Sequence, residues 1–143
     1  MTDVVAFRVR RNTTGDRQTR SHGGLWKMDN PNWPQPAAGN PPGVVLPRVD
    51  VLETDTEFVY IFEVPGTDPE QIDVEVSARE IALTGPQNRP PVAGTRRWHH
   101  LERPQGRYMR ILRTPPDVNA DDATARYRHG ELELHLPKRK GAH

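Results

Sequence analysis

Short segments rich in apolar residues, several of them alternating strictly with polar ones, are separated by turn residues from Pro47 onward. The last of them is GELELHLP, where Leu132, Leu134 and Leu136 occupy every second position and Pro137 ends the run. A period of two residues is the pattern of a strand with one buried face. Because this pattern recurs at close spacing without a helical period of ordinary length, the sequence predicts an all-β fold.

The pattern predicts about eight short strands joined by turns, which is typical of an antiparallel β-sandwich. Asp68 followed by Pro69 indicates the cap and the first position of a single helical turn. Pro65-Gly66 and Gly85-Pro86 are expected to end the strands that precede them. The expected strands are residues 49–54, 57–64, 72–76, 81–84, 96–103, 107–113, 123–128 and 131–136.

The composition excludes several classes of protein. A chain of 143 residues without cysteine suits one domain and excludes a disulfide framework or a cysteine-based zinc site. No apolar run approaches the ~20 residues that span a bilayer, and the amino terminus has no apolar signal core, so we expect a cytoplasmic protein without a membrane partner. The sequence has no phosphate-binding glycine loop and no nucleophile elbow, and we expect neither an enzyme nor a cofactor.

Two groups of residues invite interpretation as binding sites. His99-His100, His129 and His135 could bind a metal, but adjacent residues of a strand point to opposite faces, so we expect no metal site. Arg96-Arg97-Trp98 could stack on nucleic acid. Residues 47–137, however, hold 11 Lys and Arg against 16 Asp and Glu, and this acidic body argues against nucleic acid as a partner.

The first 46 residues differ from the rest of the chain. They hold six Lys and Arg against three Asp, and from residue 12 they are rich in Gly, Pro and Asn, which prevents a helix or a central strand. We therefore expect a flexible arm over residues 1–46, a β-domain over 47–138 and a short basic tail over 139–143. Near the start, Val5, Phe7 and Val9 alternate with arginines and predict a short strand on some other surface.

Three motifs follow one another in the β-domain: PRVDVLETDTEFVYIFEVPG, WHHLERPQGRYMRILRTP and ARYRHGELELHLPK. In this order they resemble the α-crystallin domain of small heat-shock proteins of the bacterial and plant type. The resemblance covers roughly residues 47–138. It implies an immunoglobulin-like β-sandwich, in agreement with the strands expected from the residues alone.

The resemblance also implies a homodimer in which one strand, here residues 97–103, is exchanged onto the partner's sheet edge near residues 48–52. The loop over residues 86–96 is long enough to carry that strand away from its own body. Arg113 occupies the position of the family's characteristic arginine, and alternation groups it with Met109 and Ile111, where a charge needs a partner. The residues expected at the dimer interface are Val49, Val51, Arg97, Trp98, His100, Glu102 and Arg113.

Members of this family carry an apolar tail motif that docks in an edge groove of a neighbour. The groove positions implied here are Ile72, Val74, Ala123 and Ala125. The tail KRKGAH has no such motif, and we expect dimers or small oligomers. Val44-Val45-Leu46 could take its place in a groove, although a lead-in to the first strand is the simpler interpretation.

The function implied by the resemblance is that of an ATP-independent holdase, which binds partly unfolded client proteins under stress and prevents their aggregation. Large apolar side chains of the arm could contact clients, or could instead pack on the protein's own sandwich. A non-chaperone adaptor that binds one folded partner is the alternative. The residues expected to contact clients are Phe7, Leu25, Trp26, Met28 and Trp33.

Overall fold

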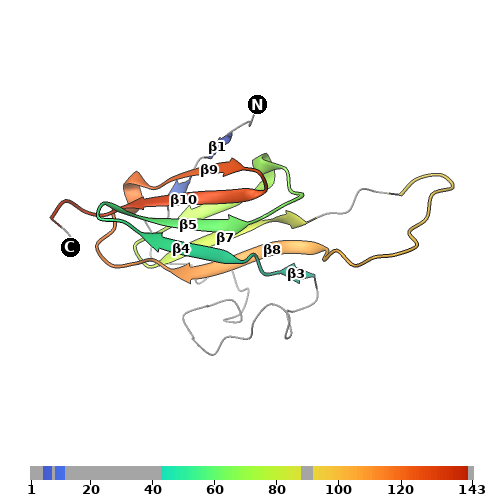
Figure 1. The fold of residues 1–143 in the computed structure, drawn as a ribbon, viewed down its shortest axis with the longest axis horizontal. Coiled ribbons are helices and arrows are strands. Elements are labelled where there is room, and N and C mark those ends of the chain that lie inside the picture. The colour runs from blue at the N-terminus through green and yellow to red at the C-terminus, as the bar shows by residue number, and fades with distance from the viewer. Residues whose placement is uncertain (1–4, 8, 12–42, 88–91, 142–143) are drawn as a thin grey trace.

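The computed structural model describes residues 5–7, 9–11, 43–87 and 92–141, which form two five-stranded sheets packed face to face (Figure 1). This arrangement confirms the predicted immunoglobulin-like β-sandwich. Residues 25–33, which include four of the expected client contacts, lie outside the described part of the chain. The strands are β1 (Val5–Phe7), β2 (Arg10–Arg11), β3 (Val44–Val45), β4 (Val49–Glu53), β5 (Glu57–Glu63), β6 (Asp73–Val76), β7 (Glu80–Gln87), β8 (Gly106–Arg113), β9 (Thr124–Arg128) and β10 (Glu131–Pro137).

The first sheet has the order β1-β9-β10-β5-β4, and all its pairings are antiparallel. β10 lies at its centre, with Leu134 opposite Ala125 on one side and Tyr60 on the other. A two-residue turn joins β9 to β10. His129 and Gly130 both have positive φ in this turn, 54° and 77°, which matches the right-handed twist of the two strands.

The second sheet has the order β2-β6-β7-β8-β3. Its three central strands are antiparallel, whereas the short outer strands β2 and β3 run parallel to β6 and β8. Two 3₁₀ turns, η3 (Pro69–Gln71) and η4 (Ala120–Asp122), connect the sheets. The predicted cap of the first is confirmed, because the Asp68 carboxylate accepts a hydrogen bond of 3.0 Å from the Glu70 N–H.

The core lies between the sheets and is built from the alternate residues that the sequence pattern places on one face of each strand. Phe62, Leu83 and Leu134 are fully buried there. Two tyrosines close one end of it: the Tyr108 hydroxyl donates to the Pro65 carbonyl at 2.9 Å, and the Tyr127 hydroxyl to the Val64 carbonyl at 3.2 Å. The remaining fully buried side chains are Pro47, Val64, Val74, Val76, Ile81, Leu132 and Leu136.

One strand is longer than the sequence pattern predicted. β7 continues through Gly85 and Pro86 to Gln87 instead of ending at Thr84. The neighbouring strand β6 pairs with β7 only as far as Thr84 of β7. Pro86 lies beyond this point, so its missing N–H removes no hydrogen bond between β6 and β7. Its other side pairs with β8, where Arg107 is its partner. Proline is therefore tolerated here because the strand has already left its second neighbour.

Candidate functional site

One edge of the first sheet has no strand beside it in the described part of the chain. β4 pairs with β5 on one side, and its residues from Asp50 to Glu53 are all exposed. Val51 is 51% exposed and Leu52 is 45% exposed, while Val49 is half-buried against the core. An edge that presents apolar side chains beside unpaired backbone groups is a template for another strand.

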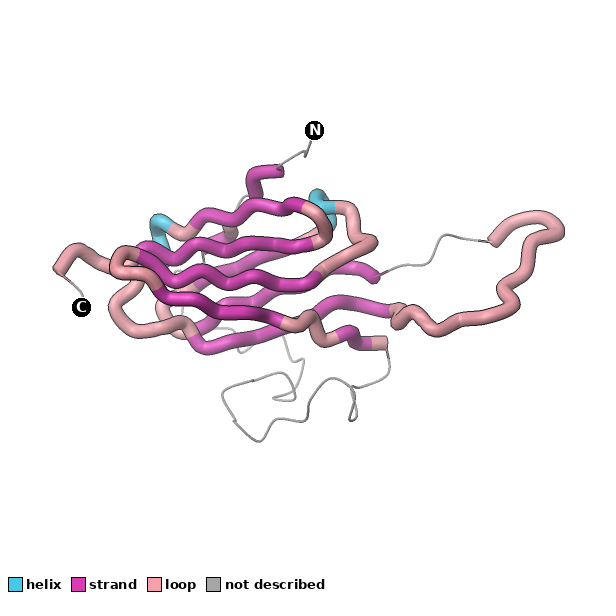
Figure 2. Tube along the Cα trace, viewed as in Figure 1, coloured by secondary structure: helices cyan, strands magenta, loops and turns pink. Residues whose placement is uncertain are grey.

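The connection between β7 and β8 leaves the sandwich and extends beyond its end as a long loop, described from residue 92 to 105 (Figure 2). We call these residues the flap. Their side chains are exposed, including Trp98 at 46% and Leu101 at 51%. A large aromatic and a leucine exposed together on a projecting segment indicate a contact surface rather than a plain connection.

The prediction of a strand over residues 96–103 is wrong for the single chain, because the structure has loop and bends there. The reason is physical: a strand needs a neighbour for its N–H and C=O groups, and the flap lies away from both sheets. His100 Nε2 lies 2.9 Å from Glu102 Oε1, an exposed contact that does not order the segment. Arg97, Trp98, His100 and Glu102 are thus together on the flap, as expected, but not on a strand.

The base of the flap touches the end of the amino-terminal region. Gly106, with φ +143°, packs so closely on Gly43 that a Cβ atom at position 106 would lie 1.9 Å from the Gly43 carbonyl oxygen. That oxygen accepts a hydrogen bond of 2.7 Å from the Arg107 N–H. Immediately afterwards Val44 and Val45 pair with β8 as strand β3. The short Val-Val-Leu segment therefore covers the edge of β8 in this structure rather than occupying a groove at Ile72.

Two of the three arginines in β8, Arg110 and Arg113, have different environments. Arg113 is exposed, and alternation places it on the outer face with Met109 and Ile111, as the sequence predicted. Arg110 is on the inner face, where its Nη1 donates to the Pro47 carbonyl at 3.0 Å and its buried Nε has no hydrogen-bond partner. Burial lowers the pKa of Arg110. The sequence argument missed this arginine, although the same alternation sets it between the core residues Tyr108 and Leu112.

The four residues expected to line an edge groove are buried. Ile72 and Val74 belong to the segment of β6, and Ala123 and Ala125 to that of β9, and none of them is more than 7% exposed. The outer edges of both strands are paired with the chain's own amino-terminal strands, β2 on β6 and β1 on β9. The alternating residues at the start of the sequence thus form a strand on this sandwich and not on another surface. Within β1, Phe7 is the partner of Ala125 in the ladder.

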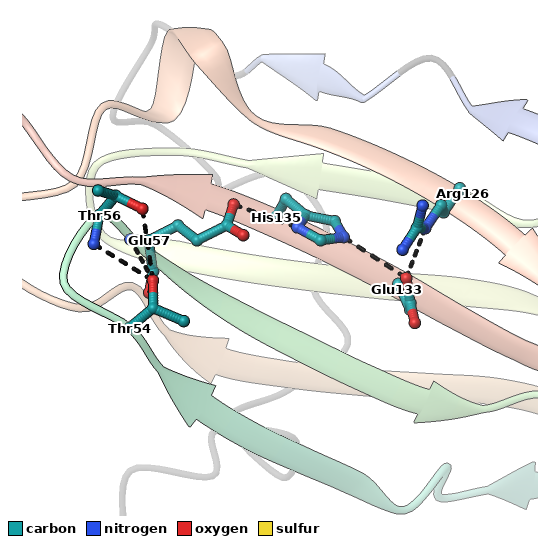
Figure 3. Close-up of polar contacts among 6 residues, drawn as sticks. All are labelled: Thr54, Thr56, Glu57, Arg126, Glu133 and His135. Atoms are coloured by element: carbon teal, nitrogen blue, oxygen red, sulfur yellow. Dashed lines mark hydrogen bonds and ion pairs between the residues drawn. The ribbon is translucent and has the colours of Figure 1, made fainter.

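Polar side chains form a network on the outer face of the first sheet (Figure 3). His135 lies between two carboxylates, with Nδ1 3.1 Å from Glu57 Oε2 and Nε2 3.5 Å from Glu133 Oε2. Arg126 donates from Nε to the same oxygen of Glu133, and this hydrogen bond is the main reason why the pKa of Glu133 lies below its ordinary value. The network joins β5, β10 and β9.

The other residues considered for metal binding are dispersed. His99 lies on the flap, His129 in the turn before β10, and His135 in the network just described. In residues 5–7, 9–11, 43–87 and 92–141 no group of three His, Asp or Glu side chains is placed so that it could hold a metal ion. The same residues contain no helix with the length and apolar character needed to cross a membrane.

Comparisons with known proteins agree with this geometry. A family model described as the Hsp20/alpha crystallin family matches residues 50–143. The chain is 36% identical to a 21.9 kDa heat shock protein of Oryza sativa subsp. japonica over 114 residues, which cover 73% of this chain and 55% of that protein. It is 27% identical over 96 residues to small heat shock protein C2 of Rickettsia felis, covering 67% and 62% respectively.

Solved structures show the same sandwich. The crystal structure of hspA from Xanthomonas axonopodis superposes with a TM-score of 0.59 at 35% identity, covering 68% of this chain and 97% of that one. The chain spans between 55% and 62% of the length of the two curated relatives named above. The residues matched by the family model, 50–143, contain the strands from β5 to β10 and the flap.

Proposed function

The chain belongs to the Hsp20/alpha crystallin family, and from this premise we propose that it is an ATP-independent holdase that binds partly unfolded proteins and limits their aggregation. One observation carries the proposal: a copy whose flap is not exchanged exposes Val51, Leu52, Trp98 and Leu101 on the edge of β4 and on the flap. Partly unfolded proteins expose apolar surface, and its association with such groups is favourable without any chemical step. No catalytic residue is required for this activity.

We further propose that two copies form a dimer by exchanging flaps. In the described residues the edge of β4 has unpaired backbone groups, and the flap has no strand to pair with. Pairing residues 97–103 of one copy with β4 of the other satisfies both. Trp98 and Leu101 would then cover the exposed Val51 and Leu52. A two-fold arrangement makes this exchange twice, so each copy gives one flap and receives one.

The dimer can be tested by placing a charge on the open edge. Val51→Lys sets a lysine on the receiving strand, a substitution that natural edge strands use to prevent pairing. Val92→Lys is the matched control, because Val92 is also exposed at 41% but lies outside residues 97–103. We expect the Val51 variant to sediment as a monomer at concentrations where the wild type and the control are dimeric. Equal dimerisation of all three proteins would contradict flap exchange at β4.

Holdase activity can be tested by heating two unrelated enzymes with and without this protein in the absence of nucleotide. We expect suppression of light scattering for both enzymes at near-stoichiometric amounts. A folded, dimeric protein that suppresses neither would contradict the proposal and favour an adaptor with one partner. Clients of a holdase are heterogeneous, so protection of a single enzyme would also favour an adaptor.

The contribution of the amino-terminal region needs a variant that leaves the sandwich intact. Deleting residues 1–46 would remove β1, β2 and β3 together with the buried Leu46. Replacing by serine the four proposed client contacts that lie outside β1 leaves the residues of these strands unchanged. We expect this fourfold variant to remain dimeric and to lose most of its suppression; full suppression would assign client binding to the flap and β4 alone. The four residues are Leu25, Trp26, Met28 and Trp33.

A further inference from the structure

The flap and the edge of β4 carry opposite charges. Residues 92–105 hold three arginines against one glutamate, so the flap is positive. Residues 48–63, which include β4 and β5, hold five Asp and Glu against one arginine. Lys138 adds one positive charge to this region, because its Nζ lies 2.6 Å from Glu53 Oε1. The region remains negative, and its charge favours a basic segment at this edge.

β4 presents one carboxylate on each of its two faces. Asp50 and Glu53 are three positions apart, so they point to opposite faces of the strand. Asp50 lies opposite Ile61, on the outer face of the first sheet. Glu53 lies opposite Phe58, which packs against the core. Both carboxylates are exposed, and a strand added beside β4 therefore meets one of them on either face.

The flap carries two histidines that are neighbours in the sequence, His99 and His100. Adjacent residues of a strand point to opposite faces, so a paired flap presents one histidine on each face. Whatever the direction or register of the pairing, one histidine shares a face with Asp50 and the other with Glu53. Both histidines are exposed in the single copy, where His100 Nε2 contacts Glu102 Oε1 at 2.9 Å. His100 and Glu102 share a face of a strand, so pairing does not require this contact to break.

Each carboxylate of β4 has one basic residue near it. Arg48 precedes Asp50 by two positions and shares its face of the strand. Lys138 contacts Glu53. The outer face is the more negative of the two, because β5 adds two carboxylates to it and none to the inner face. These carboxylates are Glu57 and Glu63.

Among these charged groups, histidine is the one that ordinarily changes its charge between about pH 5 and pH 8. Carboxylates are ordinarily negative and arginine and lysine positive throughout this range. The arginines of the flap thus give a constant attraction to β4, whereas the histidines give one that depends on pH. His135 lies on β10, two strands from β4, and contacts Glu57 at 3.1 Å, so an experiment has to separate its effect from that of the flap.

We propose that protonation of His99 and His100 strengthens the exchange of flaps, so that the dimer tightens as the pH falls. This effect requires the proposed pairing of the flap with β4, on which the inference rests. A positive charge on the flap meets the carboxylates of β4 only after association, so protonation favours the dimer over the single copy. The added affinity is present at the acid end of the range and is lost as the pH rises. Copies with uncovered apolar groups on β4 and the flap are then fewest in acid.

The experiment measures the dissociation constant of the full-length dimer by sedimentation equilibrium from about pH 8 to about pH 5.5, at low ionic strength. His99→Gln/His100→Gln removes the titrating groups of the flap and leaves polar side chains in their place. His129→Gln/His135→Gln is the matched control, because it removes the two other histidines of the described residues, which lie in the β9–β10 turn and on β10.

We expect the dissociation constant of the wild type to be lower at the acid end by at least about fourfold. A cross-strand charge pair changes an equilibrium constant by about 1.4-fold or more, and two exchanged flaps make four such pairs. The control should show the same ratio as the wild type, and the flap variant a ratio near one. Added salt should reduce the wild-type ratio, because exposed pairs are screened; a ratio that salt leaves unchanged would overturn the proposal.

Two results would refute the inference and leave the exchange of flaps in place. One is a wild-type dimer whose dissociation constant is the same at both ends of the pH range, and the other is an equal change in the flap variant. Failure of the exchange itself gives a different result, since Val51→Lys would then dimerise as well as the wild type at the alkaline end. The acid effect would in that case have no site at β4, and both proposals would be wrong.

Discussion

Gly106→Ala is the sharpest single test of how the flap is attached. A Cβ atom at this position would lie 1.9 Å from the carbonyl oxygen of Gly43, 2.4 Å from its carbonyl carbon and 2.8 Å from its Cα. The obstacle is backbone on both sides, so no side chain can rotate away. The φ of +143° adds strain for any residue with a Cβ. The variant can therefore form β8 only if Gly43 moves and β3 leaves its edge.

The magnitude follows from what is lost. A backbone held in a sparsely populated region costs about 1–3 kcal/mol. Displacing Gly43 also breaks its hydrogen bond with the Arg107 N–H, which contributes about 1 kcal/mol. β3 has only two residues and can detach without unfolding the sandwich. The loss of its pairing therefore adds little to the decrease in the free energy of unfolding. We expect Gly106→Ala to lower the free energy of unfolding by about 2–4 kcal/mol.

Gly94→Ala is the matched control. Gly94 also has positive φ, +69°, but a Cβ there would meet nothing within 4 Å. Its cost should be at most about 1–2 kcal/mol, because strain in the flap can relax locally. Urea denaturation gives the free energy of unfolding, and amide exchange at Arg107 reports the bond to Gly43. Equal stability of the two variants, with unchanged protection at Arg107, would refute the argument from close approach.

Three further substitutions test the core, a tyrosine hydrogen bond and the outer network. Leu134→Ala should lower the free energy of unfolding by about 2–5 kcal/mol in chemical denaturation, because the side chain is fully buried between the sheets; a loss below about 1 kcal/mol would mean that the core collapses around it. Tyr108→Phe should cost about 1 kcal/mol in the same assay, since the Pro65 carbonyl loses its donor, and an unchanged midpoint would show that water replaces it. Arg126→Ala should raise the pKa of Glu133 towards its ordinary value of 4.5 in a carboxyl chemical-shift titration. A carboxyl group whose pKa is lowered by folding stabilises the folded state above its unfolded-state pKa, and this stabilisation is lost as the pH falls through the folded-state pKa. The free energy of unfolding of the wild type, but not of the variant, should therefore fall by up to about 1 kcal/mol in acid. The same dependence of the free energy of unfolding on acid pH in both proteins would contradict this.

Most of the fold follows from local patterns in the sequence. Alternation identified β4, β5, β6, β8, β9 and β10 to within a few residues, because each of these strands buries one face against the other sheet. The turn chemistry at Asp68 and Pro69 was also correct. These features depend on residues that are close in the sequence, and a single sequence is sufficient to identify such local patterns. The end of β7 was predicted too early, because whether a proline can continue this strand depends on where its neighbour β6 ends.

The candidate site depends on long-range pairing, and it was predicted less completely. The residues of the flap and of β4 were identified, but the flap was given a strand that a single chain has no means to pair. Alternation predicted a short strand at Val5 and Phe7, but β2 and β3 have two residues each, too few to carry a periodic signal. Val5 and its ladder partner Tyr127 lie far apart in the sequence, and no local rule connects them. Arg110 was not identified because its contact with the Pro47 carbonyl joins residues 63 positions apart, which no local pattern displays.

The four edge strands of the sandwich, β4, β6, β8 and β9, differ in whether a further strand pairs with them. In the described residues the amino-terminal strands pair with three of them: β1 with β9, β2 with β6 and β3 with β8. The fourth, β4, has exposed Val51 and Leu52 and lies in the sheet opposite the base of the flap. An unpaired edge invites strand addition, and short added strands detach more readily than long ones. In the described residues three edges are covered by strands of two or three residues and one is uncovered, so strand addition at β4 requires no prior detachment, whereas addition at β6, β8 or β9 does.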